Sequence, residues 1–99
     1  MIESMSSALS SSLTVSRSPG WLSAWVGSEL VMMSAETGLY VSLSETGGRI
    51  WDLIEQPRTV DALCDELALE YEVTVDKIRP EVLKFVEDMQ EQKALQVQA

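Results

Sequence analysis

The sequence contains no histidine and a single cysteine, Cys64, among its 99 residues. Histidine is the commonest general base near neutral pH, and zinc sites draw on several cysteine or histidine ligands. One cysteine cannot form an internal disulfide, which is typical of proteins in a reducing compartment. These absences predict a chain that is not an enzyme and has no catalytic residues, metal or cofactor.

Basic residues are also few, since seven Lys and Arg stand against sixteen Asp and Glu, for a formal net charge of −9. Such a chain is repelled by phosphate backbones. Nucleic-acid readers need clustered basic residues, whereas Lys77, Arg79, Lys84 and Lys93 are scattered among acids. We therefore expect no nucleic-acid partner.

Long apolar runs are missing too, because no stretch approaches the roughly 18 residues of a membrane span. No basic residue precedes Arg17, so the start of the chain lacks the charged region of a secretion signal. We expect no membrane association and a cytoplasmic location.

Serine is abundant in residues 1–18. Serine competes for backbone hydrogen bonds and brings little surface to bury. This composition predicts a flexible Ser-rich arm over 1–18, followed by one domain over 19–99. The alternative is that Leu9, Leu13 and Val15 dock on that domain.

Three short apolar runs follow a Pro-Gly pair, over Trp21–Val26, Glu29–Ser34 and Leu39–Leu43. Short runs separated by glycine-containing turns predict a three-stranded antiparallel meander. One face should belong to the core and carry Trp21, Trp25, Leu30, Met32, Leu39, Val41 and Leu43. The other face is apolar as well, with Leu22, Ala24, Val26, Val31, Met33 and Tyr40. An antiparallel sheet does not require two apolar faces, so the arm, a second copy or a partner is expected to cover it.

Helical spacing dominates the rest of the chain. We expect one helix over Glu45–Glu55, with Gly47 packed closely on the sheet, and a second helix capped by Thr59. The second has an apolar stripe that buries Cys64 as an inert thiol. A third helix runs to about Gln92 and should begin at Pro80, because proline does not fit inside a regular helix. The predicted class is α+β: a three-stranded antiparallel sheet followed by three helices.

Two segments carry a family resemblance. The first is TGLYVSLSETG over residues 37–47 followed by Ile50-Trp51, and the second is PRTVDAL over residues 57–63. With their spacing to the last helix, they make residues 21–97 similar to PqqD-like proteins, the stand-alone recognition elements for ribosomally made (RiPP) precursor peptides.

The resemblance implies a winged-helix-like fold that binds the leader of a precursor peptide as an added strand. The leader would lie between the third strand and the third helix, a mode in which main-chain hydrogen bonds supply affinity. Carried onto this sequence, the strand edge is Leu39, Tyr40, Val41, Ser42 and Leu43, and the helical wall is Val82, Phe85, Val86 and Met89. The alternative interpretation is that the wall residues simply belong to the hydrophobic core.

The implied function is to deliver the leader to a maturation enzyme, which would be a leader peptidase, a cyclase or a radical SAM enzyme. The lasso-peptide type is favoured over the pyrroloquinoline quinone type. Lys93 stands where family members often have a helix-ending glycine, so the last helix is expected to run on. The alternative function is a non-enzymatic dimerising scaffold or regulatory interaction domain, a possible homodimer joined through the outer sheet face.

Overall fold

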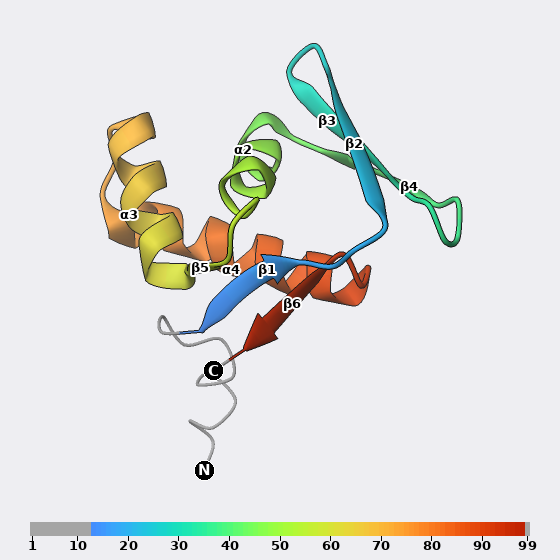
Figure 1. The fold of residues 1–99 in the computed structure, drawn as a ribbon. Coiled ribbons are helices and arrows are strands. Elements are labelled where there is room, and N and C mark those ends of the chain that lie inside the picture. Colours follow the sequence, from blue (N-terminus) through green and yellow to red (C-terminus); the bar gives the residue numbers. More distant parts are fainter. Residues whose placement is uncertain (1–12, 99) are drawn as a thin grey trace.

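The computed structural model describes residues 13–98, which form two small antiparallel sheets and three helices (Figure 1). One sheet has the order β2-β3-β4 and the other β5-β1-β6. The elements are β1 Thr14–Arg17, β2 Trp21–Val26, β3 Glu29–Ser34, β4 Tyr40–Leu43, α2 Glu45–Leu53, β5 Arg58–Thr59, α3 Val60–Tyr71, α4 Val75–Glu91 and β6 Leu95–Gln98. The predicted α+β, winged-helix-like class is confirmed, and the second sheet adds to it. No described helix has the length and apolar character to cross a membrane.

The β2-β3-β4 meander is set by two turns that contain glycine with positive φ, Gly27 at 64° and Gly38 at 77°. Glycine adopts these angles without steric cost. The first turn pairs Val26 with Glu29, and the second lets β4 begin at Tyr40, one residue later than expected. The meander therefore has the predicted order and register.

The predicted core face is right for Leu30, Met32 and Leu43, which are buried, and wrong for two residues. Trp25 is 42% exposed and Leu39 is 62% exposed. Trp25 lies on β2, an edge strand whose outer edge no described strand covers, and Leu39 lies in the turn before β4. Burial therefore follows the helices beneath the sheet, which reach only part of its inner face. The two other predicted members, Trp21 and Val41, pack against the core while partly exposed.

The predicted arm is wrong where it overlaps the folded domain, because Thr14–Arg17 forms the central strand of the second sheet. Val15 in this strand is fully buried. The Leu13 carbonyl accepts a hydrogen bond from the Val60 backbone N–H at 3.0 Å. The docking alternative thus describes Leu13 and Val15, while Leu9 lies outside the described residues.

A side-chain oxygen caps the start of each of the three helices within residues 13–98. Ser44, Thr59 and Thr74 each accept a hydrogen bond from the backbone N–H three residues on, which satisfies one unpaired donor of the first turn. The prediction that Thr59 caps a helix is confirmed. Helix α2 ends at Leu53, two residues earlier than expected.

The predicted start of the third helix at Pro80 is wrong, since α4 begins at Val75. The Thr74 cap starts the helix, and Pro80 then sits in its second turn with its ring exposed. There proline removes one intrahelical hydrogen bond, and the helix continues around it.

The expectation that α4 runs on past Lys93 is also wrong, because Lys93 itself takes the left-handed conformation at φ 60°. The Ala94 N–H donates to the Met89 carbonyl at 2.8 Å and the Lys93 N–H donates to the Gln90 carbonyl at 3.0 Å. This pair of bonds is a Schellman motif, which normally uses glycine. It ends α4 and turns the chain into β6.

The closest approach of helix and sheet is at Gly48, rather than at the predicted Gly47. A Cβ added to Gly48 would lie 2.9 Å from the Leu30 Cβ and would also meet the Trp25 ring. A Cβ added to Gly47 would lie 3.4 Å from the Leu43 Cβ, close to ordinary contact. Glycine at 48 therefore lets α2 pack directly on β2 and β3.

We expect Gly48→Ala to lower the free energy of unfolding by about 1 kcal/mol. Overpacking costs about 1–3 kcal/mol, and the better helix propensity of alanine offsets about 1 kcal/mol of that. Gly47→Ala is the matched control and should leave stability unchanged or raise it. Urea denaturation measures both variants, and equal effects at the two positions would contradict this account of α2 packing.

Candidate peptide-binding site

One edge of β4 is open, because β4 pairs with β3 alone among the described strands. The Leu39 carbonyl accepts a hydrogen bond from the Ser34 N–H at 2.9 Å, so it points toward β3. Hydrogen-bonding directions alternate along an antiparallel strand. The N–H and C=O groups of Val41 and Leu43 therefore face β3, while those of Tyr40 and Ser42 face the open side.

Below the C-terminal end of this edge lies a cavity of about 240 Å³, which we call the groove cavity. It is bounded by β4, by the start of α2 and by one side of α4. Its apolar floor comes from Leu43, Ile50 and Phe85, and its rim holds Glu81 and the ion pair of Lys84 with Asp88 at 3.2 Å. The cavity is lined by Ser42, Leu43, Ser44, Thr46, Gly47, Ile50, Glu81, Lys84, Phe85 and Asp88.

A larger cavity of about 700 Å³ lies at the other end of β4, and we call it the turn cavity. It lies between the β3–β4 turn, the segment before β2 and the end of α4. The Trp21 indole N–H donates to the Lys93 carbonyl at 3.3 Å, which fixes one wall against the other. The cavity is lined by Pro19, Gly20, Trp21, Ser34, Ala35, Glu36, Thr37, Leu39, Glu91, Gln92 and Lys93.

The predicted strand residues divide among three surroundings. Ser42 and Leu43 line the groove cavity, and Leu39 lines the turn cavity. Val41 is partly buried against the core. Tyr40 is 71% exposed and lies on the outer face of the sheet, away from both cavities.

The predicted wall residues of α4 are mostly core. Val82 and Val86 are fully buried and Met89 is nearly so, whereas Phe85 is buried but lines the groove cavity. Helical periodicity places all four on one face of α4. Only the geometry of the neighbouring strand decides which of them meets an opening.

Sequence reasoning missed Trp21, Ile50 and the turn residues as lining of the two cavities. Trp21 and Ile50 look like ordinary core positions in the sequence pattern. The available signal was the glycine-containing β3–β4 turn directly before the strand, because a turn beside an open edge leaves space around it.

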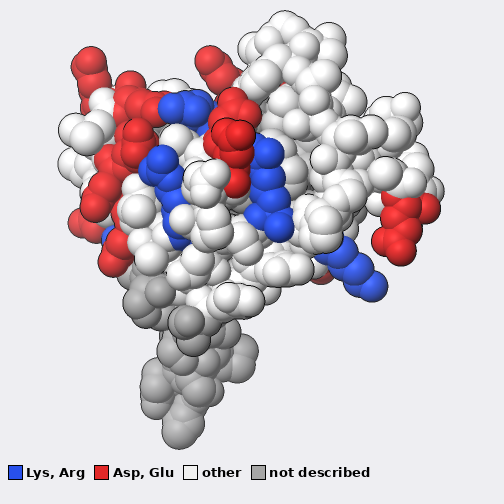
Figure 2. All heavy atoms as spheres, viewed as in Figure 1, with Lys and Arg blue, Asp and Glu red and all other residues white. Residues whose placement is uncertain are grey.

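The outer face of the β2-β3-β4 sheet is a second apolar surface. Leu22 and Val26 are exposed there, and a shallow hollow of about 260 Å³ runs from them to Tyr40. Figure 2 shows acidic side chains gathered over α3, whereas the surface over the meander carries little charge on that side of the molecule. The predicted apolar character of this outer face is confirmed.

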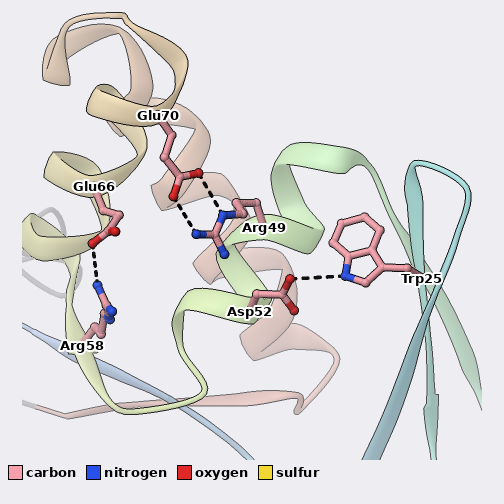
Figure 3. Close-up of polar contacts among 6 residues, drawn as sticks. All are labelled: Trp25, Arg49, Asp52, Arg58, Glu66 and Glu70. Atoms are coloured by element: carbon pink, nitrogen blue, oxygen red, sulfur yellow. Dashed lines mark hydrogen bonds and ion pairs between the residues drawn. The ribbon is translucent and has the colours of Figure 1, made fainter.

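Polar contacts hold α2, which contributes Ile50 to the floor of the groove cavity, from two sides (Figure 3). The Trp25 indole N–H donates to Asp52 Oδ2 at 3.3 Å, linking β2 to α2. Arg49 makes a two-pronged ion pair with Glu70 of α3, at 2.9 and 2.6 Å. These hydrogen bonds lower the pKa of Glu70 and raise that of Arg49.

Within residues 13–98, neither a reactive cysteine nor a metal-binding cluster accompanies the two cavities. Cys64 is fully buried, and desolvation raises the pKa of its thiol, which disfavours the reactive thiolate. Within residues 13–98, no group of three or more Cys, Asp or Glu side chains is placed to hold a metal ion. What the site offers is an open strand edge with apolar hollows below it.

The Arg49–Glu70 pair makes stability depend on acidity. We expect Glu70→Gln to lower the free energy of unfolding at pH 7 by less than about 1 kcal/mol, since both side chains are partly exposed. A carboxyl whose pKa is lowered by folding contributes stability above its unfolded pKa of about 4.3 and loses it as the pH falls. The difference between the two proteins should therefore shrink below that pH.

A double-mutant cycle with Arg49→Gln, followed by urea denaturation from neutral to acid pH, checks this coupling. A difference between wild type and Glu70→Gln that stays constant down to pH about 3 would contradict it.

Comparison with known proteins identifies relatives of this chain. The family model described as coenzyme PQQ synthesis protein D (PqqD) matches residues 29–95. The solved structure of TbiB1 in complex with the TbiA(beta) leader peptide is 26% identical, with a TM-score of 0.73, and the match covers 82% of this chain and 94% of that one. Lasso peptide synthetase B1 complexed with the leader peptide shares the fold at 18% identity, with a TM-score of 0.71 and coverage of 83% and 96%. Among curated proteins, none matches the chain.

Proposed function

The chain belongs to the PqqD family, and from this premise we propose that it binds the leader segment of a ribosomally made precursor peptide and delivers it to a maturation enzyme. The observation that carries the proposal is the open edge of β4 above the groove cavity. Two similar structures contain a bound leader peptide, which supports the same class of ligand here.

Binding proceeds by strand addition. The N–H and C=O groups of Tyr40 and Ser42 face the open side of β4, so an extended peptide can pair with both residues and become a fourth strand. Side chains of the peptide that point toward α4 enter the groove cavity and contact Leu43 and Phe85. Main-chain bonds then supply affinity for any extended segment, and the cavity selects the register.

The four predicted wall residues of α4 have two different roles. Phe85 contacts the peptide directly, whereas Val82, Val86 and Met89 support it from the core. Of the predicted strand residues, Leu39 and Leu43 flank the peptide on the inner side, and Val41 bonds to β3. In this assignment Tyr40 and Ser42 pair with the peptide, whereas Val82, Val86 and Met89 act only as support from the core.

The bound leader is then delivered to a separate maturation enzyme. A module that holds the leader raises the local concentration of the attached core peptide at its enzyme. The similar structures favour a lasso-peptide pathway over the pyrroloquinoline quinone type, and the maturation enzyme is a leader peptidase, a cyclase or a radical SAM enzyme. A single buried cysteine suits the reducing cytoplasm.

A dimerising scaffold is the second candidate, and the exposed outer face of the β2-β3-β4 sheet favours it. Leu22, Val26 and Tyr40 on that face are the apolar residues that a second copy would cover. Light scattering coupled to size-exclusion chromatography distinguishes the two candidates, since leader binding requires no dimer.

The main test is a fluorescence anisotropy titration with the labelled leader peptide of the precursor encoded beside this gene. We expect binding in the micromolar range or tighter. Tyr40→Pro should weaken it at least about tenfold, because proline removes an N–H that faces the open edge and its ring blocks the approach of a strand. The β3 ladder keeps its bonds, so the melting temperature should change little.

Tyr40→Ala is the matched control, because it removes the same side chain and keeps the N–H. It should bind nearly as well as wild type. Equal loss in the two variants would assign binding to the tyrosine side chain and contradict strand addition. A folded wild-type protein that shows no binding at high micromolar leader would overturn the proposed function for that pathway.

A further inference from the structure

The turn cavity lies on the same side of the sheet as the groove cavity. Leu39 and Leu43 alternate with Tyr40 and Ser42, so both leucines point toward the α4 side, and each lines one of the two cavities. The turn cavity has a volume of about 700 Å³, within the usual range for a ligand site. It is therefore large enough for several groups of a chain that passes along β4.

Strand geometry connects the two cavities. Strands rise about 3.3 Å per residue, so the four residues of β4 span about 13 Å. A leader strand paired with Tyr40 and Ser42 thus leaves the groove cavity and reaches the turn cavity within about four to six residues. Because both cavities open on the α4 side, they receive leader side chains separated by an even number of positions.

The chemistry of the turn cavity differs from that of the groove cavity. Trp21 and Leu39 supply an apolar wall, and the indole is held in place by its hydrogen bond to the Lys93 carbonyl. The charged groups are Glu36, Glu91 and Lys93. Within residues 13–98 neither glutamate forms an ion pair. An aromatic wall beside two carboxylates suits a side chain with an apolar stem and a cationic end.

We infer that the turn cavity is a second subsite for the leader and takes a lysine or arginine side chain. That residue lies four or six positions from the leader residue in the groove cavity. The inference rests on the proposed function, and it adds a charge requirement to a ligand that strand addition alone leaves undefined. The net charge of −9 acts in the same direction, because it attracts a basic segment from a distance.

The test uses the same labelled leader peptide and two variants of opposite expected sign. Glu36→Gln combined with Glu91→Gln should weaken binding roughly threefold to tenfold, the range expected for two exposed ion pairs. Lys93→Gln should strengthen binding up to about threefold, because it removes the competing cation. Glu87→Gln is the matched control, since Glu87 is an exposed residue of α4 that lines neither cavity, and it should have no effect.

The peptide provides the reciprocal experiment. Each lysine and arginine of the leader is replaced in turn by glutamine, and one replacement should reproduce the loss and abolish the effect of the double glutamate variant. Binding of the wild-type pair should also weaken as salt rises from about 0.05 M to about 0.5 M, with a smaller change for the double variant.

The outcomes separate this inference from the proposed function. Leader binding that is lost in Tyr40→Pro but unaffected by the glutamate variants overturns the inference and leaves strand addition standing. Binding of a leader that contains no basic residue, as tight as that of the basic leader, would also overturn the inference and leave strand addition standing. Absence of binding to the wild-type protein overturns both.

Discussion

The Arg17 side chain holds helix α2 in position, and the shape of the groove cavity depends on that position. The guanidinium donates to the Trp51 carbonyl from Nε at 3.1 Å and from Nη2 at 2.6 Å, and it lies 4.6 Å from the centre of the Trp51 ring. Trp51 is buried near the C-terminal end of α2, where carbonyls lack helical partners and the helix dipole favours a cation. One residue of β1 thus ties the second sheet to the helix that contributes Ile50 to the floor of the groove cavity.

This contact also explains how a buried indole with an unpaired N–H is tolerated. Trp51 Nε1 has no hydrogen-bond partner among the described residues, which costs about 1–3 kcal/mol. The Arg17 guanidinium over the ring and the large buried area of the ring both stabilise the folded state and offset this cost. Because Ser44 links the last residue of β4 to the first residue of α2, a shift at Trp51 would move the strand edge as well.

The meander, the Thr59 cap and the open edge could be predicted from the sequence because each depends on local signals, whereas the Thr74 cap of α4 was missed. Glycine-containing turns set the strands, and Thr59 marks a helix start on its own. The second sheet could not be predicted, since β1 pairs with β5 and β6 from distant parts of the chain and none has a long alternating pattern. The left-handed cap at Lys93 could not be predicted either, because such caps usually use glycine. Burial of Ala94 and Leu95 directly after it outweighs the backbone strain at Lys93, which costs about 1–2 kcal/mol.

For the site residues too, local patterns could be predicted from the sequence and long-range packing could not. Periodicity identified the face of α4 that carries Phe85, but it could not separate that residue from Val82 and Val86, because burial depends on where the neighbouring strand ends. The turn cavity could not be predicted from the sequence either, because three separate segments enclose it. They are residues 19–21, the β3–β4 turn and the end of α4. Nothing in the spacing of those segments indicates that they meet.

An open strand edge beside apolar surface invites pairing between copies of the same chain. Here β4 is only four residues long, and Glu29 on the adjacent strand accepts a hydrogen bond from the Ser42 hydroxyl at 3.1 Å, beside the edge. Two approaching copies each carry a net charge of −9, so like-charge repulsion opposes the pairing of two β4 edges. A leader strand with basic residues would instead be attracted to the acidic chain. Under the proposed function, the same acidity repels a second copy of the chain and attracts a basic leader.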